Sequence, residues 1–169
     1  AILHRRTNRL PFAAPEHWGS FEPVLRSSFD KDAVFLDVLT DSARSQLADA
    51  SRLTDSLRRY DDSYQHELLW WTSPLREAEG IPDGALVSQA DARRVDVNRR
   101  FPVDPADERG SPCSDDQAKV LVLSTPGDTR ADALNCGAAL SAILLECTMA
   151  FLATCTLTHL IELDESRDI

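Results

Sequence analysis

The 169-residue sequence lacks the short motifs that mark several common enzyme classes. It has no GxSxG segment for a serine nucleophile, no GxxxxGK[ST] phosphate loop and no GxGxxG dinucleotide fingerprint. No other arrangement of nucleophile and base stands out. The sequence therefore gives no support to nucleophilic hydrolysis, or to nucleotide binding through either glycine-rich motif.

Metal-binding motifs are also missing. The four cysteines show no CxxC spacing and have no flanking histidines at metal-site intervals. His159 and Glu162 could share one helix face, but two such residues do not make a metal site. We therefore expect no metal, reduced cysteines and a cytoplasmic protein. The cysteines are Cys113, Cys136, Cys147 and Cys155.

Positive charge is scarce, with 18 Lys and Arg against 28 Asp and Glu and a net charge of -10. This balance argues against a surface for nucleic acid or for an anionic membrane. A composition of 43% hydrophobic and 27% charged residues is typical of one globular domain with a real core. An acidic protein that binds an anion must gather its positive charge locally, so the positions of the arginines are informative.

Hydrophobic periodicity predicts a mixture of helices and two strands. Trp18, Phe21, Leu25 and Phe29 recur at helical spacing, although Pro23 weakens the first half of that helix. The other expected elements are a strand over 33–39, helices over 41–60 and from 61 or 62 to about 71, a buried strand over 119–124, and a long helix from 129 or 132 to about 152. The helix over 41–60 should have Asp41 as its N-cap and carry Leu47, Ala50, Leu53 and Leu57 on one face. The helix that follows it should carry Tyr64, Leu68 and Trp71 on one side.

The long helix is apolar on all sides, which predicts a central and fully packed position. Glu146 and the small residues near it argue against a membrane span. Residues 154–157 should leave the helix. Residues 1–6 look like the last turns of one helix, and 164–168 like the first turn of another. The chain also begins without Met and shows no signal peptide. We expect 1–169 to be a half-domain cut inside secondary structure at both ends.

Between 73 and 114 the pattern dissolves into Pro, Gly, Asp and Arg. So long an irregular stretch is often a lid or a binding segment. We interpret 74–114 as a lid or insertion, with 80–112 as the lid candidate. The alternative is a solvated insertion with one short helix near 86–94. Its paired arginines, 93–94 and 99–100, are then solvated charge, whereas in a lid they would close over an anion.

The strongest functional signal lies at the start of the chain. Arg5, Arg6, Thr7 and Arg9 place three guanidiniums and a hydroxyl within five residues. Guanidinium groups suit bidentate binding of phosphate oxygens, and a Thr hydroxyl adds a neutral donor. The alternative is cationic capping of a helix C-terminus, for which one Arg would suffice. Trp70 and Trp71, by contrast, are more typical of packing or of an interface than of a cofactor platform.

Three segments together resemble the nitroreductase superfamily, and most of all its Acg-type NAD(P)H nitroreductases. Residues 1–12, AILHRRTNRLPF, resemble the phosphate-binding segment RRSxRxF. Residues 119–125 are similar to the strand before the central helix, and 137–148 followed by 152–159 are similar to that helix and the turn after it. Trp70-Trp71-Thr72 fits the Acg-type subgroup in particular.

The resemblance implies an α+β nitroreductase-like fold, with a central antiparallel or mixed sheet, flanking helices and a long buried central helix. It also implies flavin mononucleotide (FMN) held at an interface between two nitroreductase-like halves. The segment of Arg5, Thr7 and Arg9, with Arg6 adjacent, would contact the phosphate and ribityl chain. Leu157, Thr158 and His159 would approach the reactive edge of the isoalloxazine, mainly through backbone groups.

Three departures from the family pattern stand out. A glycine usual before the Leu-Ala-Thr-Cys turn is Phe151 here, which would crowd the flavin ring or tighten packing. The APSxxNxQPW segment that supplies the other wall of the pocket is absent, and so is a C-terminal basic segment. The resemblance therefore implies either a homodimer or pairing with a missing N-terminal nitroreductase-like half.

Three functional hypotheses follow. The first is an FMN-binding oxidoreductase that takes hydride from NADH or NADPH and reduces nitroaromatic or quinone-like acceptors, chemistry that needs no side-chain acid or base. The second is a protein that sequesters flavin beneath a lid with little or no turnover. The third is a structural or dimerising domain that binds nothing alone. Flavin and nicotinamide are the expected small-molecule partners of the first, and neither nucleic acid nor membrane is expected.

Overall fold

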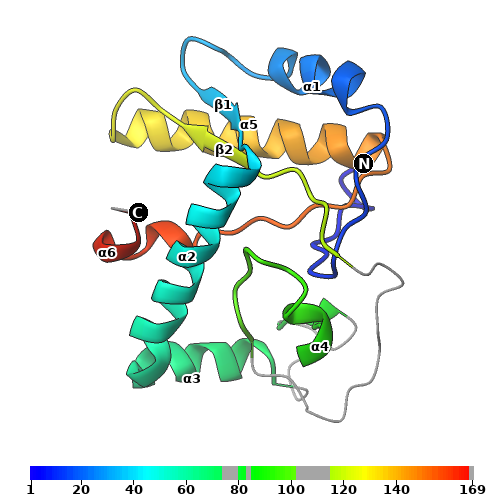
Figure 1. Ribbon diagram of the computed structural model, residues 1–169. Coiled ribbons are helices and arrows are strands. Elements are labelled where there is room, and N and C mark those ends of the chain that lie inside the picture. The colour runs from blue at the N-terminus through cyan, green and yellow to red at the C-terminus, as the bar shows by residue number, and fades with distance from the viewer. Residues whose placement is uncertain (74–79, 83–84, 102–114, 168–169) are drawn as a thin grey trace.

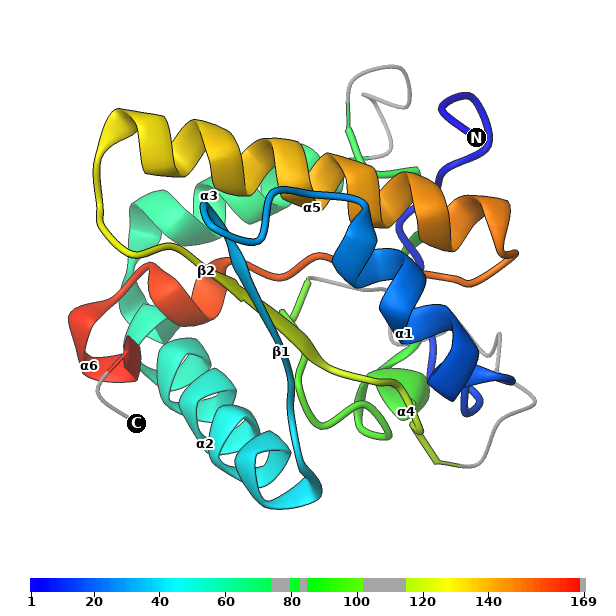
Figure 2. The same cartoon turned by 90° about the horizontal axis from the view of Figure 1, so that it is seen from above.

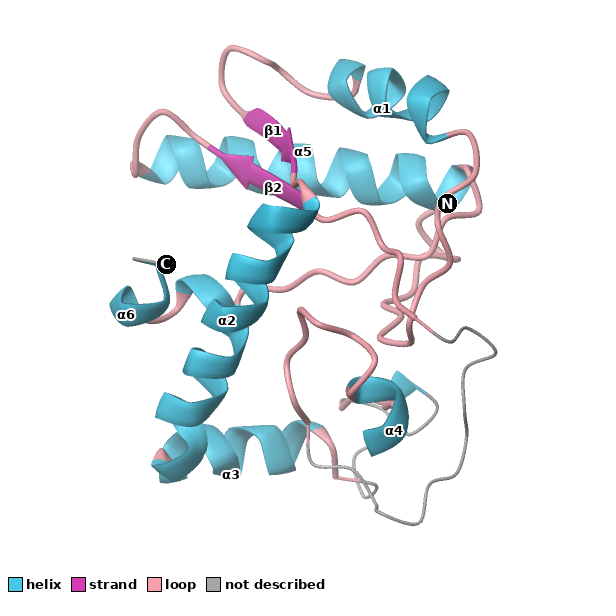
Figure 3. Ribbon diagram, viewed as in Figure 1, coloured by secondary structure: helices cyan, strands magenta, loops and turns pink. Residues whose placement is uncertain are grey.

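A computed structural model of the chain describes residues 1–73, 80–82, 85–101 and 115–167 (Figure 1). The described part mixes helices with one small sheet, which confirms the prediction of an α+β chain (Figure 3). Its elements are α1 (Trp18–Ser27), β1 (Phe35–Val38), α2 (Asp41–Leu57), η1 (Arg58–Tyr60), α3 (Asp62–Trp71), α4 (Gln89–Ala92), β2 (Leu121–Ser124), α5 (Arg130–Met149), η4 (His159–Ile161) and α6 (Asp164–Arg167).

The sheet is a single antiparallel pair, in which Leu36 of β1 lies opposite Leu123 of β2. Side chains alternate across a strand, so these two leucines face the same side, toward the core. Phe35 is 48% exposed and Val122 is 36% exposed on the other side. The prediction of a buried strand at 119–124 is therefore only partly correct, since β2 forms there but only one face of the pair is covered.

Helices α1 and α5 pack against each other and cover that inner face (Figure 2). Leu25 of α1, Leu36 of β1, and Ile143 and Cys147 of α5 form one buried cluster, joined by half-buried aromatic side chains of 18–29. The helical spacing that predicted α1 places Leu25 at the centre of this cluster, with no exposed surface. Pro23 lies within α1.

Helix α5 begins with a capping box, in which Thr129 and Asp132 exchange hydrogen bonds. Its buried residues form one stripe, Ala139, Ile143 and Cys147, whereas Leu134 is 76% exposed. The expected long helix buried on all sides is therefore wrong for this chain, because α1 and β2 cover only one side of it. Among the described residues, no helix is both long and apolar enough to cross a membrane.

A second cluster joins α2 to the segments around residues 97 and 160. The side of α2 that packs there carries small and polar side chains, and Leu57 is 45% exposed. The predicted leucine face is thus only partly correct, because the neighbouring segments come too close for large side chains. The N-cap is Thr40, whose hydroxyl accepts from the Ala43 N–H, and not Asp41. The buried α2 residues are Ala48, Ala50, Ser51 and Thr54.

The remaining elements follow the expectations in part. Helix α3 starts at its N-cap Asp61 and buries Tyr64 and Leu68, but Trp71 is 39% exposed. The short helix expected near 86–94 is α4, and α6 lies where the helix start was expected. Residues 1–6 hold only a single turn, closed on the Ala1 carbonyl. Much of the predicted lid, 74–79, 83–84 and 102–114, lies outside the described residues.

Phe151 has a backbone conformation that disfavours a side chain. Its φ of 58° lies in the left-handed region, one residue beyond the C-cap of α5. The Leu152 N–H donates to the Cys147 carbonyl and the Phe151 N–H to the Thr148 carbonyl, which is the Schellman pattern that favours glycine at this position. The Phe151 ring is 97% exposed and offsets little of that strain.

We predict that Phe151→Gly in the full-length protein raises the free energy of unfolding by about 0.5–1 kcal/mol, because relief of left-handed strain outweighs the entropy of an added glycine. Urea denaturation measures the change. Phe151→Ala is the matched control, since it removes the ring but keeps a Cβ. An equal increase in the unfolding free energy of both variants would show that removal of the ring, and not relief of backbone strain, stabilises the protein.

Candidate functional site

A cavity of about 1280 Å³ lies between the N-terminal segment, the start of α2, residues 87–101, β2 with the residues leading into it, and the C-terminal half of α5 with the turn that follows. Ligand pockets usually span roughly 300–1,000 Å³, so this space would hold a cofactor-sized molecule and more. Segments from both ends of the described chain meet here, which brings Arg9 and the turn after α5 to one place.

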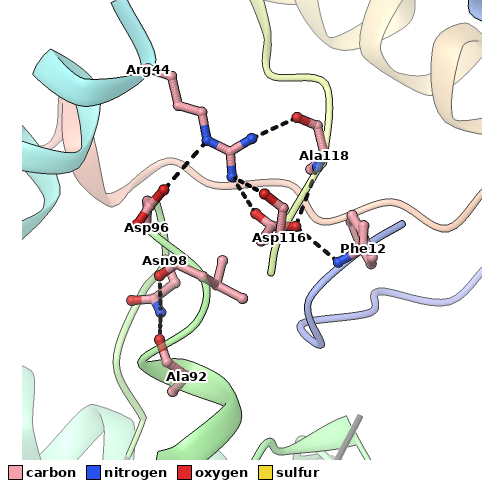
Figure 4. Close-up of polar contacts among 8 residues, drawn as sticks. Phe12, Arg44, Ala92, Asp96, Asn98, Asp116 and Ala118 are labelled. Atoms are coloured by element: carbon pink, nitrogen blue, oxygen red, sulfur yellow. Dashed lines mark hydrogen bonds and ion pairs between the residues drawn. The ribbon is translucent and has the colours of Figure 1, made fainter. Parts of the chain in front are cut away.

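One buried ion pair fastens three of these walls together (Figure 4). Arg44 of α2 donates to an Asp116 carboxylate oxygen over 2.6 Å and to the Ala118 carbonyl over 2.7 Å. The other Asp116 oxygen accepts from the Phe12 N–H at 2.9 Å. Asp96 adds a longer contact of 3.7 Å to Arg44 from the fourth wall. We call this group of residues the Arg44–Asp116 clamp.

The lining of the cavity concentrates positive charge in an otherwise acidic chain. It includes the two acidic residues Glu16 and Asp116. Asp116 is occupied by Arg44, so its charge is already balanced. The basic residues of the lining are Arg9, Arg44, Arg93, Arg99, Arg100 and Lys119. An anionic group is therefore the ligand that this cavity would attract.

The four residues of the predicted phosphate cradle do not converge. Thr7 pairs with Thr154 in a short parallel bridge, and the neighbouring Asn8 N–H donates to the Thr154 carbonyl. Arg6 turns back to the Leu3 and Arg5 carbonyls. Arg5, Arg6 and Thr7 do not line the cavity, whereas Arg9 does.

Arg9 is held at the cavity wall by two contacts. Its guanidinium donates to the Ala85 carbonyl at 3.3 Å and lies 4.8 Å from the centroid of the Phe101 ring. Burial raises the pKa of the nearby Cys155 thiol, and the positive charge of Arg9 acts against that rise. Arg9 therefore contributes an oriented positive charge between the N-terminal segment and the turn after α5.

The predicted residues after α5 divide between the cavity and the core. Leu157 and Thr158 line the cavity, and the Thr158 hydroxyl donates to Glu162 at 3.3 Å. His159 is fully buried in η4 and does not line the cavity. The structure thus brings Arg9, Leu157 and Thr158 to one space, with His159 packed behind them.

The His159 ring forms a hydrogen bond with Ser51 of α2. Its Nε2 lies 3.1 Å from the Ser51 Oγ, and that hydroxyl donates its proton to the Asn98 carbonyl at 2.7 Å. The Ser51 oxygen must then accept from His159, which fixes the neutral ring with its proton on Nε2. Nδ1 is buried without a hydrogen-bond partner among the described residues.

The same burial controls the charge of His159. The pKa of the ring is lowered to about 4, mainly by burial and also by the positive charge of Arg99, while Glu162 acts in the opposite direction. A neutral, buried ring suits a packing role between η4 and α2. The hydrogen bond between His159 and Ser51 attaches η4 to α2, and this helps to fix the position of the turn that ends at Thr158.

Several residues of the cavity were not singled out by the sequence. Arg44 and Asp116 are 72 positions apart, so no local pattern relates them. Phe101 and Lys119 lack any motif. Arg99, read above as solvated or as part of a lid, instead donates through Nε to the Tyr64 hydroxyl at 3.0 Å. Local positive charge in an acidic chain was the available signal; it pointed to Arg5, Arg6, Thr7 and Arg9, of which Arg9 lines the cavity.

The described residues offer no cluster that would hold a metal ion. Cys136, Cys147 and Cys155 are free thiols, as predicted, and Cys113 lies outside the described residues. What the cavity lining offers to a ligand is cations, apolar surface and backbone groups.

Comparison with known proteins adds relatives from Mycobacterium tuberculosis. No profile of a known protein family matches the chain. The chain is 58% identical over 169 residues to the "Uncharacterized protein Rv3127" of strain H37Rv, a match that covers 100% of this chain and 49% of that protein. It is 53% identical over 169 residues to the "Putative NAD(P)H nitroreductase acg" of the same strain, and this match covers 100% of the chain and 51% of that protein. A more distant relative, "Putative NAD(P)H nitroreductase Rv3131", is 26% identical over 170 residues, 99% of this chain and 48% of its own length. The chain spans about half the length of these curated relatives.

We predict a pH dependence of stability that originates at His159. Its folded pKa of about 4 lies below the ordinary 6.5, so the unfolded chain binds more protons between these values. The contribution is fully present above pH 6.5 and is lost as the pH falls toward 4, by at most about 3 kcal/mol.

The measurement is the unfolding free energy against pH for the full-length protein and for His159→Gln, which cannot titrate. The wild-type curve should fall more steeply through this window than the variant curve. A proton NMR titration of the wild-type imidazole checks the same point directly, and a midpoint near 6.5 would contradict it.

Proposed function

Because these matches place the chain with the Acg-type nitroreductases, we propose that it forms one wall of an FMN site in an NAD(P)H-dependent, nitroreductase-like oxidoreductase. The observation that supports this most is the basic lining of the cavity in a chain with a net charge of -10. Positive charge gathered in that way favours an anionic cofactor. In this proposal the anion is the flavin phosphate.

The residues present fit such a cofactor at two places. Arg9 offers an oriented guanidinium, which suits bidentate binding of a phosphate. Leu157 and Thr158 offer backbone groups on the same cavity for the flavin ring. We propose Arg9 as the main phosphate contact. The remaining predicted contacts, Arg5, Arg6 and Thr7, stay predictions for the assembled site.

Bound flavin would supply the redox chemistry, since it accepts hydride from a reduced nicotinamide and passes electrons to nitroaromatic or quinone-like acceptors. The chain's own residues would then only bind and orient the cofactor and exclude water. This division of roles agrees with a cavity lined by cations and apolar groups.

The proposed partner of this half is a second nitroreductase-like half, either in the same longer protein or in a second copy. The large cavity and the exposed side of α5, with Leu134 and Met149, leave room for such a neighbour. Light scattering of the full-length protein separates the two arrangements, because a monomeric mass would exclude a second copy.

The alternative function, flavin sequestration with little turnover, is favoured by one observation. Phe151 lines the cavity, is 97% exposed, and stands where the family resemblance expects glycine. An aromatic ring at that position would cover bound flavin from acceptors.

We predict that Arg9→Ala in the full-length protein weakens FMN binding about 10- to 100-fold and leaves riboflavin binding unchanged, since a charge-assisted hydrogen bond contributes roughly 1.5–3 kcal/mol. Flavin fluorescence titrations measure both ligands. Arg59→Ala is the matched control, because Arg59 in η1 is exposed and does not line the cavity. Equal losses of FMN and riboflavin would show that Arg9 does not contact the phosphate.

Turnover distinguishes the two functions. We predict that stopped-flow mixing of the flavin-loaded full-length protein with NADPH or NADH bleaches the visible absorbance of oxidised flavin. Phe151→Gly should accelerate the subsequent reoxidation by a nitroaromatic acceptor, because the acceptor gains access to the ring. A cofactor that stays oxidised with both nicotinamides would favour sequestration.

A further inference from the structure

Five side chains form an alternating series of guanidiniums and aromatic rings. The guanidinium carbons of Arg58 and Arg99 each lie 5.1 Å from the centroid of the Tyr64 ring. Arg99 also lies 6.0 Å from the centroid of Phe101, and Arg9 lies 4.8 Å from the same centroid. All four separations fall within the range of cation–π attraction. We call this series the arginine–aromatic stack.

The stack runs from the protein interior to the cavity wall. Arg58 in η1 and Tyr64 in α3 do not line the cavity, whereas Arg99, Phe101 and Arg9 do. Its members come from three parts of the chain that are distant in sequence. The N-terminal arginine therefore takes its position from the α2–α3 corner of the fold, through the segment that ends at Phe101.

Charge compensation differs between the two ends. Arg58 binds Asp61 at 2.6 Å and lies 3.9 Å from Glu162. Arg99 lies 3.8 Å from Glu162 and bonds the Tyr64 hydroxyl. Among the described residues, the one hydrogen-bond acceptor of Arg9 is the neutral Ala85 carbonyl, and no carboxylate lies within ion-pair distance of it. The inner end is neutralised, and the cavity end keeps its positive charge.

This arrangement orients a charge without cancelling it. A free arginine side chain loses rotamer freedom when it binds an anion, and that loss weakens binding. Stacking on Phe101 and the bond to Ala85 fix the guanidinium of Arg9 beforehand, while the aromatic face takes none of its N–H donors. Stacking therefore leaves donors available for an anion.

We propose that Phe101, whose ring also lies within cation–π distance of Arg99, is a positioning residue that holds Arg9 ready for the phosphate of the ligand. This inference rests on the proposed role of Arg9 in phosphate binding. It adds a specificity determinant, because a pre-oriented Arg9 favours phosphorylated flavin over riboflavin. Phe101 itself need not touch the ligand.

The test compares FMN and riboflavin affinities of Phe101→Leu and Phe101→Tyr in the full-length protein. Leucine keeps an apolar side chain but removes the aromatic face, so FMN should bind about three- to tenfold more weakly with riboflavin unchanged. Tyrosine restores the ring and should restore wild-type FMN affinity. A loss of both ligands by the same factor in Phe101→Leu would assign Phe101 to packing and overturn the inference.

Arg9→Ala, measured beside these variants, separates two failures. If Arg9→Ala lowers the preference for FMN and Phe101→Leu does not, the positioning role is wrong and the phosphate role of Arg9 stands. If neither variant changes the preference, the proposed role of Arg9 fails, and the positioning role fails with it.

A second measurement does not depend on the folding of Phe101→Leu. In the NMR spectrum of the wild-type full-length protein, the Nε–H proton of Arg9, identified by its loss in Arg9→Lys, should be shifted upfield by the Phe101 ring. An unshifted signal in the wild-type protein would overturn the stack as the device that positions Arg9.

Discussion

The cavity depends above all on the Arg44–Asp116 clamp. Its ion pair is largely buried, and each partner also bonds backbone groups of a different segment. Breaking a buried pair by removing one partner typically costs about 3–5 kcal/mol, because the other charge is left uncompensated. Here the loss of Asp116 would also remove one of the two hydrogen bonds that join Phe12 to the residues leading into β2, the other being the bond from the Gln117 N–H to the Phe12 carbonyl at 2.8 Å. The clamp thus helps to place the N-terminal segment against the rest of the fold, together with the hydrogen bond from the Asn8 N–H to the Thr154 carbonyl and the contacts of Arg9 itself.

Around the clamp, the chain separates structural charge from available charge. Arg44, Arg58 and Arg99 have carboxylate partners that lie within reach in the fold. Arg9 has a carbonyl and an aromatic face instead. Arg9 can thus present its charge to a ligand, because carboxylates pair with these three arginines and no carboxylate of the described residues pairs with Arg9. The homology to the Acg-type nitroreductases fits this arrangement, and the proposed flavin phosphate is the anion that would use it.

Particular elements show how far sequence reasoning reached. The spacing of Trp18, Phe21 and Leu25 correctly predicted α1, because a large apolar stripe has only one way to be buried. The same reasoning gave α2 a leucine face, whereas Ser51 and Thr54 are buried there. Close approach of His159 and the Asn98 carbonyl selects small side chains on that face, and periodicity carries no information about which neighbour will come close.

The sequence by itself determined the class of the chain, most of its helices and strands, and the group Arg5, Arg6, Thr7 and Arg9 as candidates for binding an anion. Local spacing, capping residues and the rarity of positive charge are properties of short segments, so they survive without a structure. Only the tertiary structure decided that Arg9, and not Arg5, Arg6 or Thr7, lines the cavity. It also decided that His159 is a buried packing residue beside that space, and that Phe101 stacks on Arg9. These outcomes depend on contacts between residues tens of positions apart, which no local pattern encodes.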